Sequence, residues 1–275
     1  MFYLANDNEM ISIHPEQFYD GTLRLHLPQM EVRTIIWAYE NDAELFTLMC
    51  IKGHYNSPFW PIDLYMPYIP HARMDRVESG STDVFTLKYF CEAINNMNFA
   101  HVIVVDPHSN VSCGLLDRIV QVDVMPYVEK AIEDVRSLNP DKEIVLFFPD
   151  EGSKKRYKNL AEKYSYTYGV KTRNWDTGKL SDLTIIDPQI VEDKVVLIVD
   201  DICSRGGTFK RAAAGLKEHC ADNIYLYVSH AEDTMYSGDM YRDTDIAGIY
   251  TLNGSIGHHN ELDELSKVKL IGNGG

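Results

Sequence analysis

The sequence predicts an α/β fold, in which helices flank mostly parallel sheets. Three apolar runs indicate strands buried on both faces, because hydrophobic residues follow one another without alternation. These runs are Val102–Val105, Ile144–Phe148 and Val195–Val199. Stretches with helical character lie before and after the runs, at 84–96, 125–137, 153–163 and 208–218. Strand and helix therefore alternate along the chain.

Each apolar run ends abruptly in a polar loop that carries acidic residues. The loops are 106–109, 149–153 and 200–208. Ligands of open α/β sheets bind outside the carboxyl ends of the strands, so we expect the functional site at these loops. We place a domain boundary within Asp117–Asp123, which gives one domain over 1–120 and a second over 121–275.

The composition narrows the classes of function. The chain has 275 residues, 45% of them hydrophobic, which suffices for one large core or two moderate ones. With 41 acidic and 26 basic side chains the formal net charge is -15, and such a field repels nucleic acid and anionic membranes. The sequence has neither a secretory signal nor an apolar run near the ~20 residues that span a bilayer. We expect a cytoplasmic protein that binds neither nucleic acid nor membrane.

The cysteines are five, an odd number, and are scattered along the chain. They lack the paired spacing of a zinc site, so we expect no zinc. The pattern is typical of reduced thiols in a cytosol-like compartment.

The loop after the third apolar run has the features of a sugar-phosphate site. Gly206-Gly207 allows backbone N–H groups to converge on phosphate oxygens, Thr208 adds a hydroxyl, and the following helix contributes its positive dipole end. Asp200 and Asp201 would repel phosphate, so they suit ribose hydroxyls or magnesium. The alternative is a plain chain turn with helix-capping acids. The combination of buried strand, acid pair, loop and helix favours the ligand site.

Two segments resemble a known family. Val199–Thr208 is similar to the phosphoribosyl diphosphate motif of type I phosphoribosyltransferases and of ribose-phosphate pyrophosphokinases. Met66–Arg76 is similar to the Pro-Tyr-x-x-Tyr-Ala-Arg-Gln-Asp-Arg segment by which the pyrophosphokinases hold ATP, and which ordinary phosphoribosyltransferases lack. The chain thus resembles ribose-phosphate pyrophosphokinases, as a short variant like those of phages. This implies two tandem type I phosphoribosyltransferase-like (Rossmann-like) domains, the first for ATP and the second for the sugar phosphate.

The resemblance also implies the chemistry. The anomeric hydroxyl of ribose 5-phosphate would attack the β-phosphorus of ATP, releasing AMP and forming phosphoribosyl diphosphate. Positioned cations stabilise charge on the transferring group, and in the family pattern these are Lys171 and Arg173, on a flexible loop that closes over the nucleotide. The metal is Mg²⁺, held by His108 and Asp150, because magnesium takes its other ligands from water and phosphates.

For ATP, the resemblance implies contacts from two regions. Gln17–Thr22 is similar to a Phe-Ser-Asp-Gly-Glu segment that reaches the adenine of a neighbouring subunit, which implies a homo-oligomer. In this reading Phe18 stacks on the base, and the arginines of the other segment bind triphosphate oxygens. The implied ATP contacts are Phe18, Asp20, Gly21, Arg73, Asp75 and Arg76.

The sugar-phosphate loop departs from the family at Ser204-Arg205, where the family has Asp-Thr. The change adds positive charge beside the 5-phosphate. Two acceptors therefore stay open, namely ribose 5-phosphate and an extended form such as ADP-ribose, which phage pyrophosphokinases use in rebuilding NAD. A type I phosphoribosyltransferase and a non-catalytic relative are further alternatives. The implied sugar-phosphate contacts are Asp200, Asp201, Ser204, Arg205, Gly206, Gly207 and Thr208.

Overall fold

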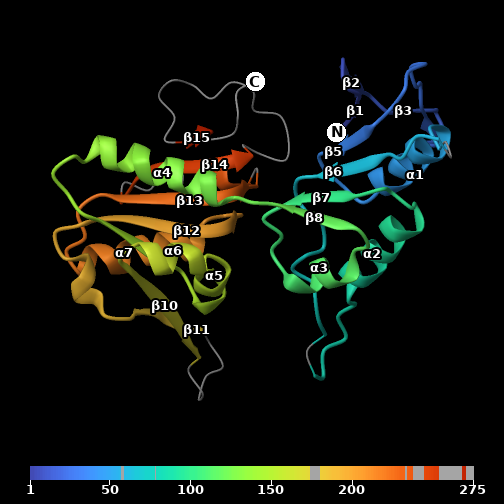
Figure 1. Cartoon of the computed structure of the whole chain (residues 1–275). Coiled ribbons are helices and arrows are strands. Elements are labelled where there is room, and N and C mark those ends of the chain that lie inside the picture. The colour runs from blue at the N-terminus through green and yellow to red at the C-terminus, as the bar shows by residue number, and fades with distance from the viewer. Residues whose placement is uncertain are drawn as a thin grey trace. The chain divides into compact units, whose positions relative to one another are not determined.

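The computed structural model describes residues 1–56, 59–77, 79–173, 180–232, 234–237, 245–253 and 268–270. The chain divides into two compact units, Met1–Asp123 and Val124–Gly275. In each unit, helices pack against a mostly parallel sheet (Figure 1), so the predicted α/β class is confirmed. The boundary proposed from the sequence, between residues 120 and 121, falls within β8 (Ile119–Val122), which pairs with the sheet of the first unit.

The sheet of the first unit runs in the order β2-β1-β5-β6-β7-β8. Strands β5 to β8 are parallel, and β1 is antiparallel to β2 and β5. Its other strands are β1 (Phe2–Ala5), β2 (Met10–Ile13), β5 (Thr34–Trp37), β6 (Asp63–Met66) and β7 (Val102–Val105). A separate hairpin is formed by β3 (Glu16–Gln17) and β4 (Leu23–Arg24). The helices are α1 (Glu44–His54), α2 (Thr86–Asn96) and α3 (Asn110–Leu115).

Trp37, at the end of β5, organises the core of the first unit. The side chain is fully buried, and its ring stacks on Phe2 with 5.9 Å between centroids. Trp37 Nε1 donates to Glu44 Oε2 at 2.9 Å. Because Glu44 lies in the first turn of α1, this bond holds the start of the helix beside the carboxyl end of the strand.

The sheet of the second unit runs in the order β11-β10-β9-β12-β13-β14-β15. Neighbouring strands are parallel, except that β11 is antiparallel to β10. The strands are β9 (Ile144–Phe148), β10 (Tyr166–Arg173), β11 (Leu180–Ile185), β12 (Val195–Cys203), β13 (Ile224–Ala231), β14 (Ile246–Asn253) and β15 (Val268–Leu270). The helices are α4 (Met125–Leu138), α5 (Glu151–Arg156), α6 (Lys158–Lys163), the 3-10 helix η1 (Pro188–Val191), α7 (Gly207–Glu218) and α8 (Thr234–Ser237).

The centre of the second sheet is buried on both faces. Every residue of β9 and of β13 is buried. On one face, Val145 and Ile198 belong to the same core as Phe209 and Leu216 of α7. Continuous apolar runs are what such a position requires, so this part of the sequence prediction is confirmed.

The helices begin and end near the predicted residues, with one difference. The predicted helix over 153–163 is two short helices, α5 and α6, separated at Tyr157. Tyr157 is fully buried and stacks on Phe148 with 6.4 Å between ring centroids. Its backbone angles, φ -99° and ψ 35°, are not helical, so the helix breaks where the ring turns into the core.

The carboxyl ends of two strands differ from the prediction. Strand β12 continues to Cys203, so Asp200 and Asp201 lie in the strand and not in the loop; pairing with β13 up to Cys203 and Ala231 holds them there. The backbone of Lys171–Arg173 likewise belongs to β10, paired with β11, and not to the predicted flexible loop. Antiparallel pairing satisfies backbone groups that a loop would leave to solvent. Residues 174–179 of the predicted loop lie outside the described residues.

None of the helices in the described ranges combines the length and the apolar composition needed to cross a bilayer.

Gly169 of β10 sits where no side chain fits. A Cβ atom there would lie 2.5 Å from Leu183 Cδ1 and 2.8 Å from the carbonyl oxygen of Pro149. Gly169→Ala should therefore lower the free energy of unfolding by about 1–3 kcal/mol, the usual cost of overpacking, as measured by urea denaturation. Gly215→Ala in α7 is the control, because its Cβ would lie 3.4 Å from Ile185 Cδ1 and alanine favours helix. Equal stability of the two variants would contradict this packing.

Candidate active site

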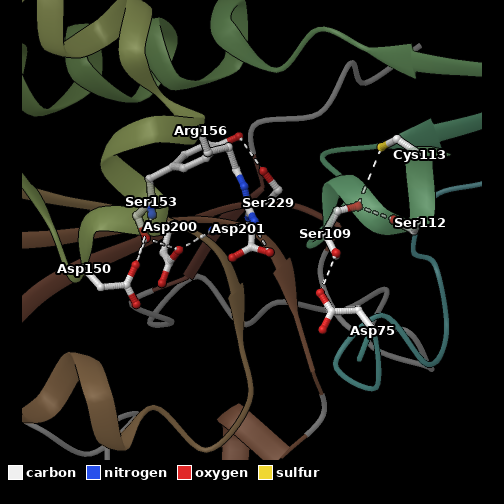
Figure 2. A network of polar contacts seen from close by, with 11 residues as sticks. Asp75, Ser109, Ser112, Cys113, Asp150, Ser153, Arg156, Asp200, Asp201 and Ser229 are labelled. Atoms are coloured by element: carbon white, nitrogen blue, oxygen red, sulfur yellow. Dashed lines mark hydrogen bonds and ion pairs between the residues drawn. The ribbon is translucent and has the colours of Figure 1, made fainter. Parts of the chain in front are cut away.

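An ion pair lies at the carboxyl end of β12. Asp201 is 2% exposed, and its Oδ2 lies 2.5 Å from Arg156 Nη1 (Figure 2). Arg156 is the last residue of α5, the helix that follows the neighbouring strand β9. A buried carboxylate needs such a partner, because desolvating an unpaired charge is costly.

Ser153 links this strand end to the loop after β9. Its hydroxyl donates to Asp200 Oδ1 at 2.7 Å, while Asp150 Oδ1 lies 3.3 Å away. Asp150 caps α5, since its Oδ1 accepts from the backbone N–H of Ser153 at 3.0 Å. Figure 2 shows these side chains converging from α5 and β12. The carboxylates of Asp150 and Asp200 are therefore gathered around one serine.

The gathered acids change the proton affinity of Asp200. Burial raises the pKa of this carboxyl well above 3.8, and the charge of Asp201 raises it further. The hydrogen bond from Ser153 lowers the pKa, and the charge of Asp150 raises it. Burial and like charge outweigh the hydrogen bond, so the ionised form of Asp200 is only partly compensated.

The turn after β12 has the geometry of an anion site. Gly206 has φ +79°, in the left-handed region that glycine adopts without strain, and it precedes the first residue of α7. Gly207 is exposed, and a Cβ atom there would meet only Arg211 Nη1, at 3.8 Å. The backbone N–H groups at the start of this helix and its dipole favour an anion. Arg205 is exposed, and Ser204 Oγ lies 3.1 Å from Thr234 Oγ1.

In the first unit, Asp75 connects two of the predicted segments. Asp75 Oδ2 accepts a hydrogen bond from Ser109 Oγ at 2.6 Å (Figure 2). Ser109 also caps α3, where it accepts from the backbone N–H of Val111 at 3.0 Å. Ser109 directly follows His108, which is partly exposed. The segment with Arg73 and Arg76, both exposed, is thus tied to the loop that carries the predicted metal ligand.

The hairpin of β3 and β4 carries the other predicted nucleotide contacts. Phe18 is 53% exposed, with the guanidinium of Arg24 5.7 Å from its ring centroid. Asp20 Oδ1 accepts from the backbone N–H and the hydroxyl of Thr22, at 3.0 and 2.7 Å, and these bonds lower its pKa. Gly21 has φ +82°. Beside the hairpin lies a cavity of about 570 Å³, lined also by α1 residues.

Three predictions about the site, the positions of the Lys171 and Arg173 side chains and the pairing of His108 with Asp150, stay predictions. The side chains of Lys171 and Arg173 lie outside the described part, although their backbone is described. His108 belongs to the first unit and Asp150 to the second, so their predicted pairing stays a prediction. Within the described residues, no group of three or more His, Cys, Asp or Glu side chains forms a metal site.

Two serines in these networks were not predicted from the sequence. Ser153 bridges Asp150 and Asp200, and Ser109 bridges Asp75 and α3. A local signal exists for each. Aspartate and serine are residues that commonly cap helices, so Asp150 before α5 and Ser109 before α3 indicate where these helices begin. The contacts to Asp200 and Asp75 are long-range and have no such signal.

Removing the partner of Asp201 tests the buried ion pair. Arg156→Met should lower the free energy of unfolding by about 3–5 kcal/mol, because it leaves a buried carboxylate uncompensated. Adding Asp201→Asn should recover part of the loss in a double-mutant cycle followed by urea denaturation. Lys163→Met is the matched control, since its 2.5 Å pair with Glu129 has side chains 58% and 38% exposed. A loss from Arg156→Met as small as that of the control would contradict the assignment.

The raised pKa of Asp200 predicts a dependence of stability on pH. The folded state binds this proton more tightly than the unfolded state, so its contribution to stability is complete below pH 3.8 and is lost as pH rises through the folded pKa. In metal-free protein, Asp200→Asn should therefore raise the free energy of unfolding at neutral pH and not at strongly acidic pH. Urea denaturation across this range measures the difference, with Asp222→Asn at a surface ion pair as the control. If Asp200→Asn were less stable than wild type at neutral pH, the raised pKa of Asp200 would be refuted.

Comparison with known proteins agrees with this geometry. The model of the phosphoribosyl transferase domain family matches residues 128–248, within the second unit. A ribose-phosphate pyrophosphokinase of Hyphomonas neptunium is 29% identical over 192 residues, which cover 69% of this chain and 60% of that protein. One from Sulfurisphaera tokodaii is 27% identical over 231 residues, covering 81% of this chain and 77% of that protein. This chain thus spans less than two thirds of the length of the first relative.

A solved structure extends the likeness to both units. The crystal structure of phosphoribosylpyrophosphate synthetase from Mycobacterium smegmatis superposes with a TM-score of 0.73, covering 94% of this chain and 85% of that one at 15% identity. At this identity the likeness shows the fold, which is that of two phosphoribosyltransferase-like units. Together with the matching domain model, the fold and the relatives make this chain similar to ribose-phosphate pyrophosphokinases over most of its length.

Proposed function

We propose that this protein is an ATP-dependent pyrophosphokinase, which transfers the β,γ-diphosphate of ATP to the anomeric hydroxyl of a ribose 5-phosphate. The observation that carries the proposal is the end of β12. There an acid pair fixed by Arg156 and Ser153 precedes a glycine turn at the start of α7. The names of the relatives support the same activity. The product with ribose 5-phosphate is phosphoribosyl diphosphate, and the nucleotide released is AMP.

The two acids of β12 have different tasks in this proposal. Asp201 is engaged by Arg156 and almost fully buried, so its task is to hold the strand end in place. Asp200 is partly exposed, and it is the carboxyl that would accept hydrogen bonds from ribose hydroxyls. The 5-phosphate would bind the backbone N–H groups at Gly206-Gly207 and the hydroxyl of Thr208.

The chemistry of the donor set fits Mg²⁺. Asp150 and Asp200 gather hard oxygen ligands around Ser153, and burial, followed by the charges of Asp201 and Asp150, raises the pKa of Asp200. A hydrated dication would relieve this repulsion, and magnesium binds through one or two carboxylates plus substrate phosphates. On this ground we propose Asp150 as one protein ligand, and we propose His108 as the other from its resemblance to the metal-binding histidine of the family. When bound, the ion would neutralise charge on the phosphate oxygens.

The remaining cations and the adenine contacts complete the proposed site. Lys171 and Arg173 would stabilise the transferring diphosphate, and their place on the strand pair β10–β11 gives them a backbone anchored to the sheet. Arg73 and Arg76 would bind the triphosphate, with Asp75 holding their segment through Ser109. The exposed ring of Phe18 and the carboxylate of Asp20 would receive an adenine from a second subunit, which makes the proposed enzyme a homo-oligomer. We place it in the cytoplasm.

For the acceptor we propose ribose 5-phosphate, with ADP-ribose as the second candidate. The observation that favours the second is Arg205, an exposed cation beside the phosphate turn, which suits an additional anionic group. A type I phosphoribosyltransferase is the alternative of another class. It would consume phosphoribosyl diphosphate and a base, and would not cleave ATP to AMP.

Product analysis separates these functions. The protein is incubated with Mg²⁺ and ATP, together with ribose 5-phosphate, ADP-ribose or no acceptor, and products are identified by mass spectrometry. We expect AMP and an acceptor heavier by a diphosphate. Lys171→Ala should reduce kcat by about a hundredfold or more, because a cation aimed at developing charge is lost, whereas Lys158→Ala, at an exposed surface pair, should not. ADP in place of AMP, or no acceptor-dependent product, would refute the proposal.

A further inference from the structure

His71 joins three separate segments of the first unit. Its Nε2 lies 2.8 Å from Asp42 Oδ1, and its Nδ1 lies 3.1 Å from Thr86 Oγ1. Tyr39 Oη donates to the same oxygen of Asp42 at 2.8 Å. Asp42 follows β5, Thr86 begins α2, and His71 belongs to the turn after β6. One imidazole thereby fixes the relative positions of three element ends.

The backbone at His71 has a conformation that side chains rarely adopt. Its φ is +62°, in the left-handed region that is uncommon outside glycine and asparagine. The carbonyl oxygen of His71 accepts from the backbone N–H of Met74 at 2.8 Å, which closes a turn. The ring also packs against Phe90, with 5.5 Å between centroids. An imidazole held at both nitrogens and over an aromatic ring keeps the turn in this conformation.

Arg73 projects from between two anchors. On one side, His71 is held by Asp42 and Thr86. Ala72, between His71 and Arg73, is 1% exposed. On the other side Asp75 accepts from Ser109 Oγ at 2.6 Å. Arg73 itself is exposed. A guanidinium on a backbone fixed at both ends loses little further freedom when it binds an anion, which is the physical basis of preorganisation.

From this geometry we propose that His71 is a positioning residue for nucleotide binding. It acts through the backbone of the turn, and it presents Arg73 to the phosphates of a nucleoside triphosphate. The proposal rests on the proposed function in one respect, namely that the segment of Arg73 binds ATP. The recognition is the pairing of a planar guanidinium with phosphate oxygens. In this proposal His71 acts on ATP only through the turn and has no part in binding the sugar phosphate, so its loss should affect the apparent affinity for ATP and not the affinity for the sugar phosphate.

Steady-state kinetics tests the positioning role of His71. The variants are His71→Phe, Asp42→Asn, their combination, and His101→Phe. His71→Phe keeps a ring against Phe90 but removes both nitrogen contacts, and Asp42→Asn weakens the same contact from its other side. His101→Phe is the matched control, because His101 Nδ1 lies 2.9 Å from Asp63 Oδ1 in the same unit. We expect His71→Phe to raise the KM for ATP about tenfold, the effect of a misplaced binding group. The kcat and the KM for the sugar phosphate should stay within about twofold of wild type, and the His71→Phe/Asp42→Asn double variant should be no worse than His71→Phe.

Two results would overturn the proposal. In the first, His71→Phe and Asp42→Asn both keep the wild-type KM for ATP. In the second, the KM values for both substrates change together, in proportion to a lower melting temperature, as a merely structural role would give. If wild-type protein forms no AMP with any acceptor, the proposed function fails, and calorimetric titration with Mg²⁺-ATP decides about His71. Weaker ATP binding by His71→Phe than by His101→Phe would then support its role, and equal binding, or no ATP binding by wild type, would overturn it.

Discussion

Two adjacent carboxylates at the end of a buried strand constrain the second unit of this protein. Strand pairing with β13 carries Asp200 and Asp201 into the sheet, where like charges repel and water is scarce. Arg156 pairs with Asp201, and Ser153 donates to Asp200. Both partners come from α5, the helix that Asp150 caps. The acid pair, this helix and the loop after β9 therefore depend on one another, and a substitution in any of them should alter the positions of the others.

The compensation is incomplete at Asp200, and this incompleteness makes the site suited to a ligand. Its raised pKa means that the ionised carboxyl costs stability until a cation or hydroxyl donors reach it. The first unit uses a similar device, because Ser109 holds Asp75 as Ser153 holds Asp200. In both cases a serine at the start of a helix fixes an aspartate from another segment. Rigid placement of this kind lets a site bind charged groups without reorganising first.

The sequence was sufficient where local pattern determines structure. The continuous apolar runs gave the central strands, and the glycine pair gave the turn before α7. It was insufficient where long-range pairing decides. The residues around Asp200 do not show that pairing with β13 extends β12 to Cys203. The residues around Tyr157 do not show that the Tyr157 ring packs on Phe148 in the core. The partners of Asp75, Asp201 and His71 come from distant segments for the same reason.

The most direct test of this account is a titration of the Asp200 carboxyl itself, followed by NMR in protein labelled with ¹³C at the aspartate carboxyl and assigned with Asp200→Asn. In metal-free, ligand-free protein the account predicts a pKa for Asp200 well above 3.8, because burial and the neighbouring carboxylates outweigh the bond from Ser153. Addition of Mg²⁺ together with the sugar phosphate should lower it. A pKa of Asp200 at or below 3.8 in the ligand-free protein would contradict the account.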